Sequence, residues 1–543
     1  MASTTTQQVY LATTALIVIS ITLFARARKR KSKFGSLPLP PGPPALPILG
    51  NVHQAPKSHA WLTFHDWSKT YGPIMHLNMA GQSVIVLNSS KTAHDLLSKR
   101  GATFSDRPRF VVAHELALKG FHMLLRPYDE RFKLHQKLEG PVLSDKAAKA
   151  YCSFQDLESR QLLFDVLTRS EKDASINCHD DVERMTASII YSLFYGRRVR
   201  SAADDVLIQA HAVNAEFSQL AQVGKYLVDS FPLLIKVPLP AFLAPWKAEA
   251  AAHWSKQRAL HVGNLERGLD EIGWNISKQM RRAVVGSLLP EGTEMSAEEL
   301  ALDIGIMADA ALDASTETLM WFVLACVTET HQGGPSSWMS RAQRDLDEVV
   351  GRERLPAFED RERLPYLEAV VEEVMRWRPA GAGGVPHFTK VESSYEGFRI
   401  PENSVVIANH WGITREEEVF GPADVERFVP ERWLGADPDL PTPGFGYGRR
   451  ICPGRHVARN SLWIAVARLL WAFEIKPGLD DEGKLVTIVD TRGTDGLVTK
   501  PLPFKASFEP RGDWVRDVVM RECDTWGVDY HRLLDQIGSD VFK

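Results

Sequence analysis

The sequence is poor in cysteine and has no excess of basic charge. Its five cysteines are spread over 543 residues, and no two of them form a CxxC pair. A sparse, odd number of cysteines argues against a disulfide framework or a zinc cage and indicates a reducing compartment. The formal net charge of −4 provides no basic field for nucleic acid, so nucleic-acid binding is not expected.

Long uncharged hydrophobic runs are also scarce near the N-terminus, where only residues 10–25 form one. This run extends about 24 Å as a helix, slightly less than the ~30 Å hydrocarbon core of a bilayer. Because the basic run 26–33 follows it, the positive-inside rule predicts a signal anchor, with residues 1–9 lumenal and the remainder cytosolic. A cleaved signal peptide would carry its basic residues ahead of the run. A peripheral helix on a disordered tail is the other alternative.

Proline is concentrated in one segment, residues 37–47, which holds six prolines. Such a segment is extended and semi-rigid and suits a spacer between a membrane anchor and a folded body. Recognition by a proline-binding domain is a weaker interpretation. The composition, 44% hydrophobic and 24% charged, is that of a globular protein. We therefore expect a basic and proline-rich linker over 26–50 and one catalytic domain over 51–543.

The most informative segment is the loop FGYGRRICPG, Phe445–Gly454. Its glycines allow a tight turn and the close approach of a flat ligand, and Pro453 suits the first position of a helix. Cys452 then lies at a helix N-terminus, flanked by Arg449 and Arg450, where a thiolate is favoured. A thiolate in this position can be the axial ligand of haem iron. The alternative is a small buried cysteine at a turn.

This loop matches the cytochrome P450 signature FxxGxRxCxG at every specified position, and the chain resembles that family over residues 37–510. The resemblance implies a mainly α fold with a small β region and heme b ligated by Cys452, with Phe445, Gly448, Arg450 and Gly454 as further cofactor-binding residues. It also implies a haem-thiolate monooxygenase in the endoplasmic reticulum membrane, single-pass, that acts on a small lipophilic substrate. Electrons would come from NADPH through NADPH–cytochrome P450 reductase, with cytochrome b5 as a further candidate donor.

A second informative segment is a long helix that the sequence predicts from Ser296 to about Gln332. Ser296 and Glu299 form a capping box, and the middle of the helix is apolar nearly all round, which indicates burial. Asp313 and Ser315 interrupt this apolar surface. The segment resembles the P450 I helix, in which an acid and an alcohol lie beside the oxygen. Ala314 stands where the family has threonine, so Asp313 and Ser315 are our proton-relay candidates; a water or the substrate could serve instead.

Anchoring of the haem propionates is less clear from the sequence. Residues 127–138 resemble the P450 helix that places tryptophan and arginine on the propionates, but Phe132 and Gln136 occupy these two positions. Lys133 and His135 are the remaining candidates there, and His387 is a third in a position where P450s place a propionate ligand. The alternative for each is a solvated helix face or an ordinary core histidine.

Glu373 and Arg376 lie at i,i+3 on a predicted helix over 366–379. On its own such a pair is most often an exposed contact of little energetic weight. Together with the FVPERW segment, residues 428–433, it resembles the P450 triad in which Glu373, Arg376 and Arg432 would form a buried structural network. We further expect a strand hairpin over 73–88 and strands within 383–390 and 397–413. A basic patch for an acidic reductase is expected at Lys133, Lys137, Arg449 and Arg455, with a merely solvated surface as the alternative.

The segment from Gly384 to Leu434 looks most like fungal P450s of secondary metabolism, including enzymes similar to O-methylsterigmatocystin oxidoreductase. This resemblance predicts an aromatic or polyketide-derived substrate. Two other functions stay open. One is haem-thiolate chemistry without hydroxylation, such as phenol coupling, desaturation or rearrangement. Ala314, in place of the family's threonine, is the residue that supports this alternative. The other is a haem carrier or sensor without turnover.

Overall fold

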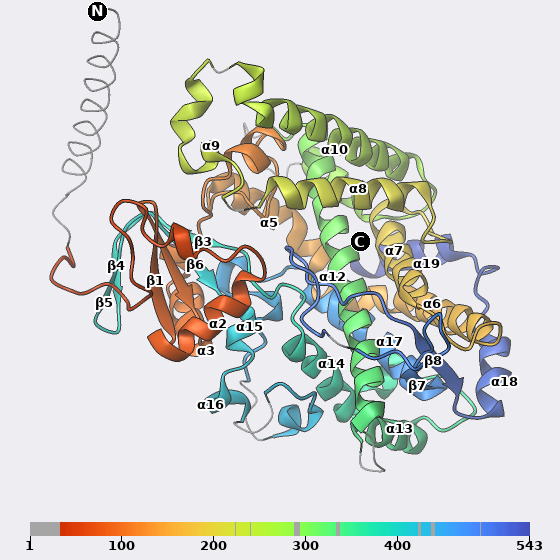
Figure 1. The fold of residues 1–543 in the computed structure, drawn as a ribbon. Coiled ribbons are helices and arrows are strands. Elements are labelled where there is room, and N and C mark those ends of the chain that lie inside the picture. The colour runs from red at the N-terminus through yellow and green to blue at the C-terminus, as the bar shows by residue number, and fades with distance from the viewer. Residues whose placement is uncertain are drawn as a thin grey trace, which may run out of the picture.

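The computed structural model describes residues 33–222, 224–238, 240–286, 294–332, 337–421, 425–435, 440–488 and 490–542. The predicted anchor over 10–25, the lumenal residues 1–9 and the first part of the linker lie outside the described residues. The described chain is mainly helical, with most of its strands gathered on one side and a separate pair of strands among the helices on the other (Figure 1). This is the fold class that the sequence predicted.

The helices are α2 (Ala60–Tyr71), α3 (Ser90–Ala93), α4 (Gly101–Phe104), α5 (Glu130–Leu143), α6 (Asp145–Ser170), α7 (His179–Tyr195), α8 (Asp205–Leu220), α9 (Leu227–Ser230), α10 (Pro245–Asp270), α11 (Ile276–Val285), α12 (Ala297–Gln332), α13 (Trp338–Val349), α14 (Pro365–Trp377), α15 (His410–Ile413), α16 (Glu417–Phe420), α17 (Arg455–Ala472), α18 (Asp513–Glu522) and α19 (Tyr530–Val541). The strands are β1 (Ile74–Met79), β2 (Gln82–Leu87), β3 (His387–Thr389), β4 (Ser393–Tyr395), β5 (Phe398–Ile400), β6 (Ser404–Ala408), β7 (Phe473–Pro477) and β8 (Ala506–Pro510).

The largest sheet has four strands in the order β1-β2-β6-β3. The hairpin β1–β2 is antiparallel, β2 pairs in parallel with β6, and β3 closes the sheet antiparallel to β6. The predicted hairpin is confirmed; its turn is Ala80-Gly81, where both residues have positive φ. The expected strands over 397–413 are confirmed as β5 and β6, but the last residues form helix α15 instead.

The proline-rich segment is extended and packs along strands β1 and β5. The carbonyl of Pro41 accepts a hydrogen bond from His76 N on β1 at 2.9 Å, and the carbonyl of Pro38 accepts one from Arg399 N on β5 at 2.8 Å. Gly42 permits this approach, because a Cβ there would lie 2.1 Å from the carbonyl oxygen of His76. The segment is therefore fixed to the folded body rather than a free spacer.

Helix α12 crosses the middle of the molecule, with α8 and α10 lying over it and α17 beneath (Figure 1). Ser296 Oγ accepts from Glu299 N at 3.0 Å, which confirms the N-cap. The carboxylate of Glu299 binds Arg131 and His135, so its side chain serves a contact between helices. Among the described residues, α12 is the one helix apolar and long enough to cross a membrane, and most of its apolar stretch is buried in the core.

The C-terminal residues add two helices to the side of this core. Val515, Val518 and Val519 of α18 are buried, as their helical spacing predicted. Leu534 and Ile537 of α19 are buried as well, and α19 packs on α6. This tail stabilises the helical body and lies away from the cysteine loop.

Candidate active site

The cysteine loop comes directly before α17. This helix begins two residues later than predicted, because Pro453 and Gly454 form the turn that precedes it. The backbone N–H of Cys452 donates to the carbonyl oxygen of Phe445 at 2.8 Å. The bond closes the loop and holds Cys452 just ahead of the helix N-terminus.

Two glycines of the loop adopt a conformation that L-residues rarely adopt. Gly446 has φ +73° and Gly448 has φ +54°. A Cβ at Gly448 would also lie 2.2 Å from the carbonyl oxygen of Leu97, so the loop packs directly on the backbone of a neighbouring segment. Gly454 differs, because its φ is −79° and the nearest contact of an added Cβ is Cys452 Sγ at 3.9 Å.

Burial dominates the electrostatics of Cys452. It raises the pKa of the thiol, while the backbone N–H groups of Gly454 and Arg455 and the charge of Arg455 act in the opposite direction. The predicted influence of Arg449 and Arg450 is not what the structure shows, because both guanidiniums are engaged elsewhere: Arg449 donates to Tyr128 Oη, and Arg450 to backbone carbonyls. Coordination to a metal ion is what deprotonates a buried thiol of this kind.

A largely apolar cavity of about 920 Å³ opens above the loop. Its floor includes Phe445, Gly446 and Cys452, and one wall is the middle of α12, from Ile306 to Thr318. The roof comes from α8 and α10, and residues 494–498 line a further side. The volume is at the upper end of the range for small-molecule and cofactor sites.

Two arginines and a histidine meet at one edge of this cavity. Arg107 is buried, and the pKa of its guanidinium is lowered by burial and by the charge of Arg450, whose own pKa burial lowers to about 10. His387 is buried beside them, and its pKa is also lowered, by burial and then by Arg107. Among the described residues, no carboxylate lies within ion-pair distance of either guanidinium.

The acceptors of these two guanidiniums are backbone carbonyls, those of Leu124, Val385 and Pro386 for Arg107 and those of Ser105, Met123 and Arg126 for Arg450. A buried arginine, Arg107, beside the partly buried Arg450 is costly without a carboxylate unless an anion binds there. The arrangement therefore fits the two propionates of a haem, and the cavity floor fits its flat ring beside Cys452. Phe132 supports the site from below, with Arg450 stacked 3.7 Å from its ring centroid.

Lys133 and His135 lie outside this anionic site. Lys133 is about half exposed and its ammonium pairs with Glu130 at 2.6 Å, on the solvated face of α5. His135 is fully buried, with Nε2 2.9 Å from Glu299 and Nδ1 2.9 Å from Asp303. Neither residue lines the cavity, because the face of α5 that carries them turns toward solvent or toward the start of α12. Of the predicted cofactor-binding side chains, His387 and Arg450 line the cavity together with Arg107, whereas Lys133 and His135 do not.

The structure brings Glu373, Arg376 and Arg432 together behind the loop. Arg376 donates to Glu373 through Nε at 2.7 Å and Nη2 at 2.8 Å, and Arg432 Nε lies 3.5 Å from Glu373 Oε1. The carboxylate also accepts from the indole N–H of Trp433 at 3.0 Å. Glu373 is fully buried, so this cluster is the structural network that the sequence pattern predicted.

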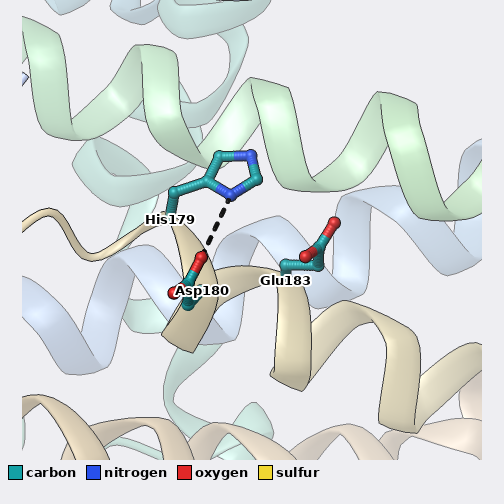
Figure 2. A group of neighbouring side chains, drawn as sticks. All are labelled: His179, Asp180 and Glu183. Carbon is teal, nitrogen blue, oxygen red and sulfur yellow. Dashed lines mark ion pairs between the residues drawn. The ribbon is translucent and has the colours of Figure 1, made fainter. Parts of the chain in front are cut away.

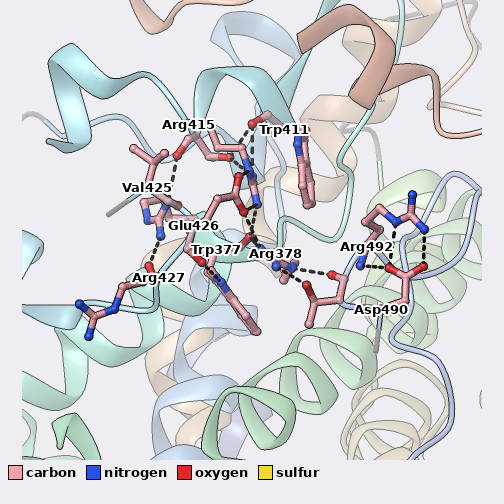
Figure 3. Close-up of polar contacts among 12 residues, drawn as sticks. Trp377, Arg378, Trp411, Arg415, Val425, Glu426, Arg427, Asp490 and Arg492 are labelled. Carbon is pink, nitrogen blue, oxygen red and sulfur yellow. Dashed lines mark hydrogen bonds and ion pairs between the residues drawn. The ribbon is translucent and has the colours of Figure 1, made fainter. Parts of the chain in front are cut away.

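Two further arginines, Arg378 and Arg415, lie near Arg376 (Figure 3). Arg378 stacks 4.0 Å from the ring centroid of Trp377, and Arg415 stacks 3.3 Å from that of Trp411. Arg415 Nε also donates to Glu426 at 2.6 Å. These contacts join the end of α14 to α15 and to the segment around Glu426.

Asp313 and Ser315 both line the cavity. Asp313 Oδ1 lies 3.6 Å from Lys500 Nζ and 3.9 Å from His211 Nδ1. The acid is therefore held by cationic side chains from the loop 494–500 and from α8. Burial alone would lower the pKa of Lys500, but Asp313 and Glu317 raise it.

The charged contacts continue from Asp313 toward the surface. His211 binds Glu183 on α7, and His179 Nε2 lies 3.3 Å from Glu317 on α12. Figure 2 shows His179 and Glu183 beside Asp180, which is exposed. A connected set of titratable side chains therefore links the cavity wall with solvent.

Sequence reasoning missed three residues of this site. Arg107 lies in the segment FSDRP, and Lys500 in TDGLVTKP; both segments resemble P450 pocket borders, but the resemblance did not point to these side chains. His211 carries no local signal at all, because only the packing of α8 over α12 brings it near Asp313.

A cysteine at the floor of a large apolar cavity, below a long helix and beside two arginines that form no ion pair among the described residues, suits a flat, anionic group that a thiolate can ligate. The sequence profile of the Cytochrome P450 family matches residues 40–508. The chain therefore belongs to the cytochrome P450 family, and its cofactor is haem.

Similar proteins come from fungi. Cytochrome P450 monooxygenase aneD of Aspergillus aculeatus is 39% identical over 503 residues, covering 92% of each chain. Cytochrome P450 monooxygenase drtD of Aspergillus calidoustus is 36% identical, covering 92% of this chain and 91% of the relative. Cytochrome P450 monooxygenase peniB of Penicillium patulum is 36% identical, covering 92% and 90%. These findings confirm the resemblance to fungal P450s and show that the chain is a monooxygenase.

Proposed function

We propose that Cys452 is the thiolate ligand of heme b and that the enzyme oxidises a small lipophilic substrate, an aromatic or polyketide-derived intermediate of fungal secondary metabolism. One observation carries the first part. All five cysteines are described, and Cys452 is the one that lines the cavity. The others lie in the core or, for Cys152, beside Asn460. The substrate class rests on the fungal relatives and on the apolar cavity.

The bound haem supplies the oxygen-activating chemistry, favoured by a thiolate ligand. The chain's own residues position and enclose it. Arg107, Arg450 and His387 receive the propionates, and the Gly446–Gly448 backbone allows the flat ring to approach the loop. The apolar wall of α12 excludes water from the substrate.

Asp313 and Ser315 are the proposed proton donors on the cavity wall. A general acid in this role must lie within hydrogen-bond reach of the reacting group or of one bridging water. Asp313 faces the cavity and is linked to solvent through Lys500 and His211. Ser315 lies in the same turn of α12 and lines the cavity, so its hydroxyl can pass the proton on.

The membrane and electron-transfer partners belong to the same proposal. Residues 10–25 would anchor the enzyme in the endoplasmic reticulum membrane as a single pass, with residues 1–9 lumenal and the body, 51–543, cytosolic. Large apolar side chains exposed between α9 and α10, Phe231, Leu233 and Phe242, would add contact with the bilayer. NADPH–cytochrome P450 reductase, with cytochrome b5 as a second candidate donor, would dock on the face that carries Lys133, Lys137, Arg449 and Arg455.

One feature favours a second function. Ala314 lacks the hydroxyl that the family carries there, and the nearby hydroxyl of Thr318 donates to the carbonyl of Ala314 at 2.7 Å. Fewer hydroxyls for proton transfer would suit phenol coupling, desaturation or rearrangement better than hydroxylation. The mass of the product distinguishes these outcomes, because only hydroxylation adds an oxygen atom.

The test is the CO difference spectrum of the reduced protein, wild type beside Cys452→Ala. A Soret band at about 450 nm in the wild type alone is the expected signature of the Cys452 thiolate. A wild-type band at about 420 nm in folded protein would overturn this ligand assignment and favour a haem carrier or sensor without turnover.

A further inference from the structure

The roof of the cavity carries polar side chains, although the cavity is otherwise largely apolar. His122 comes from the loop before α5, Asn214 from α8, Gln257 from α10 and Asp309 from α12. Asp309 lies one helical turn before Asp313 and is itself buried. These four residues, which we call the polar roof, have no part in the haem site or in the Asp313 network described above.

Hydrogen bonds within the roof fix the amide of Gln257. Its Oε1 accepts from His253 Nε2 at 2.6 Å, and its Nε2 donates to His261 Nε2 at 3.2 Å. His261 Nε2 also lies 3.5 Å from Asp309 Oδ2. Gln257 is therefore oriented by two buried histidines, and Asp309 is tied to the same row.

Helix α12 makes room for the imidazole of His261 at Gly305. A Cβ at Gly305 would lie 2.2 Å from Nδ1 of His261 and 2.4 Å from its Cγ. The imidazole ring consequently packs directly on the backbone of α12. The position of His261, and with it that of Gln257 and Asp309, depends on the missing side chain.

The roof is polar, and burial disfavours the charged forms of its ionisable side chains. Burial lowers the pKa of His122 and of His261 to about 3, and burial and Asp313 raise the pKa of Asp309. Nδ1 of His122 accepts from Leu124 N at 3.2 Å, so the ring proton is on Nε2 and can be donated. The imidazole N–H of His122 is a hydrogen-bond donor on this surface, and the raised pKa of Asp309 favours the protonated carboxyl beside it.

We propose that the polar roof is a specificity site that hydrogen-bonds a neutral oxygen, a hydroxyl or carbonyl, at the end of the substrate remote from the oxidised carbon. This inference rests on the proposed function, because it assigns the orientation of the substrate in the same cavity. An apolar ligand would leave the ring N–H of His122 without an acceptor from the substrate, which is the basis of discrimination by such sites. A charged end group would lose its hydration without gaining a counter-ion.

The experiment uses the holoenzyme and a homologous series of 1-alkylimidazoles with four different ends: methyl, hydroxyl, carboxylate and ammonium. The imidazole nitrogen binds the iron, and the Soret shift gives the dissociation constant. At one chain length we expect the hydroxyl end to bind about tenfold more tightly than the methyl end. The carboxylate and ammonium ends should bind more weakly than the hydroxyl end at every length.

Three variants assign the effect to the roof. Gln257→Met and His122→Phe should each reduce the preference for hydroxyl over methyl, and Gly305→Ala should do so by displacing His261. Gln343→Met is the matched control, since it removes a buried glutamine of α13 that lies outside the cavity and donates to Phe473 O. The control should keep the wild-type preference.

Equal affinity for the hydroxyl and methyl ends at all chain lengths would overturn the inference, as would tighter binding of the ammonium end, which requires a charged Asp309. Failure of the proposed function looks different. A protein without the thiolate-ligated haem would lack the CO band at about 450 nm, whatever the imidazole series shows.

Discussion

Lys500 Nζ lies 3.6 Å from Asp313 Oδ1, across the gap between the loop 494–500 and the middle of α12. The same ammonium lies 3.2 Å from Glu317, one turn further along the helix. A lysine with two carboxylates keeps its charge and orients both of them. The acid that faces the cavity is therefore held in place and is also in contact with groups that lead to solvent.

Replacing Asp313 by asparagine should slow turnover about a hundredfold, because general acid catalysis of this kind contributes on that order. The CO band at about 450 nm should persist, since Asp313 belongs to the α12 wall of the cavity and is not the residue proposed to ligate the iron. Product formed per NADPH consumed and the solvent isotope effect on turnover are the measurements. Lys500→Met should slow turnover less, because it removes the ammonium that orients Asp313 but leaves the carboxyl group in place. Unchanged turnover in Asp313→Asn, together with slowed turnover in Ser315→Ala, would assign proton delivery to the hydroxyl of Ser315 instead.

Replacing Glu373 by glutamine should destabilise the protein by about 3–5 kcal/mol, because the buried Arg376 would then lose the carboxylate that it pairs with. Chemical denaturation and the yield of haem-loaded protein measure the loss. Glu431→Gln is the matched control in the adjacent motif. The carboxylate of Glu431 is about half exposed and pairs with Arg341, so its loss should cost about 1 kcal/mol or less. Similar losses in both variants would contradict a special role for the buried triad.

Local patterns in the sequence predicted most of the architecture. Helix α12 was predictable from its N-cap at Ser296 and from its apolar surface, and the loop and triad from short motifs whose spacing is fixed by a turn or a helix. These features share one physical property. Each depends on residues that are close in the chain, so that backbone geometry alone sets which side chains meet.

The site residues that the sequence placed wrongly or missed depend on contacts between distant segments of the chain. His135 binds Glu299, 164 positions further along the chain, and the sequence of α5 alone does not show which neighbour its buried face will meet. Arg107 and Arg450 come together in the same way, from a loop before α5 and from the cysteine loop. Their proximity depends on how these two loops pack against each other, and no periodicity within either of them encodes it.

Gly448→Ala should destabilise the loop and reduce haem loading. A left-handed backbone at a non-glycine residue costs about 1–3 kcal/mol, and the added methyl would meet the carbonyl of Leu97 as well. Gly454→Ala provides the control within the same motif. Its backbone is already in an ordinary conformation, so the change should alter the free energy of unfolding by only a few tenths of a kcal/mol. Denaturation of both apoproteins measures the difference, and equal losses would contradict the structural distinction between the two glycines.

The stability of the protein should fall between pH 6.5 and pH 9 because of His135. Burial would lower the pKa of this imidazole, but Asp303 and Glu299 raise it to about 9 from an ordinary value of 6.5. A raised pKa means that the folded state binds the proton more tightly than the unfolded state does. The stabilisation is therefore complete below pH 6.5 and is lost as pH rises through 9. Its size is on the order of 1–3 kcal/mol.

The free energy of unfolding in urea, measured at pH 6.5 and pH 9 for the wild type and for His135→Gln, checks this expectation. The wild type alone does not decide the question, because burial and Asp303 also raise the pKa of Glu139, which weakens stability in the same direction. Glutamine keeps a hydrogen-bonding side chain between Glu299 and Asp303 but takes up no proton. The variant should accordingly lose less stability than the wild type over this interval. An identical loss in both proteins would mean that the histidine is not charged in the folded state, and that Glu299 is held by Arg131 alone.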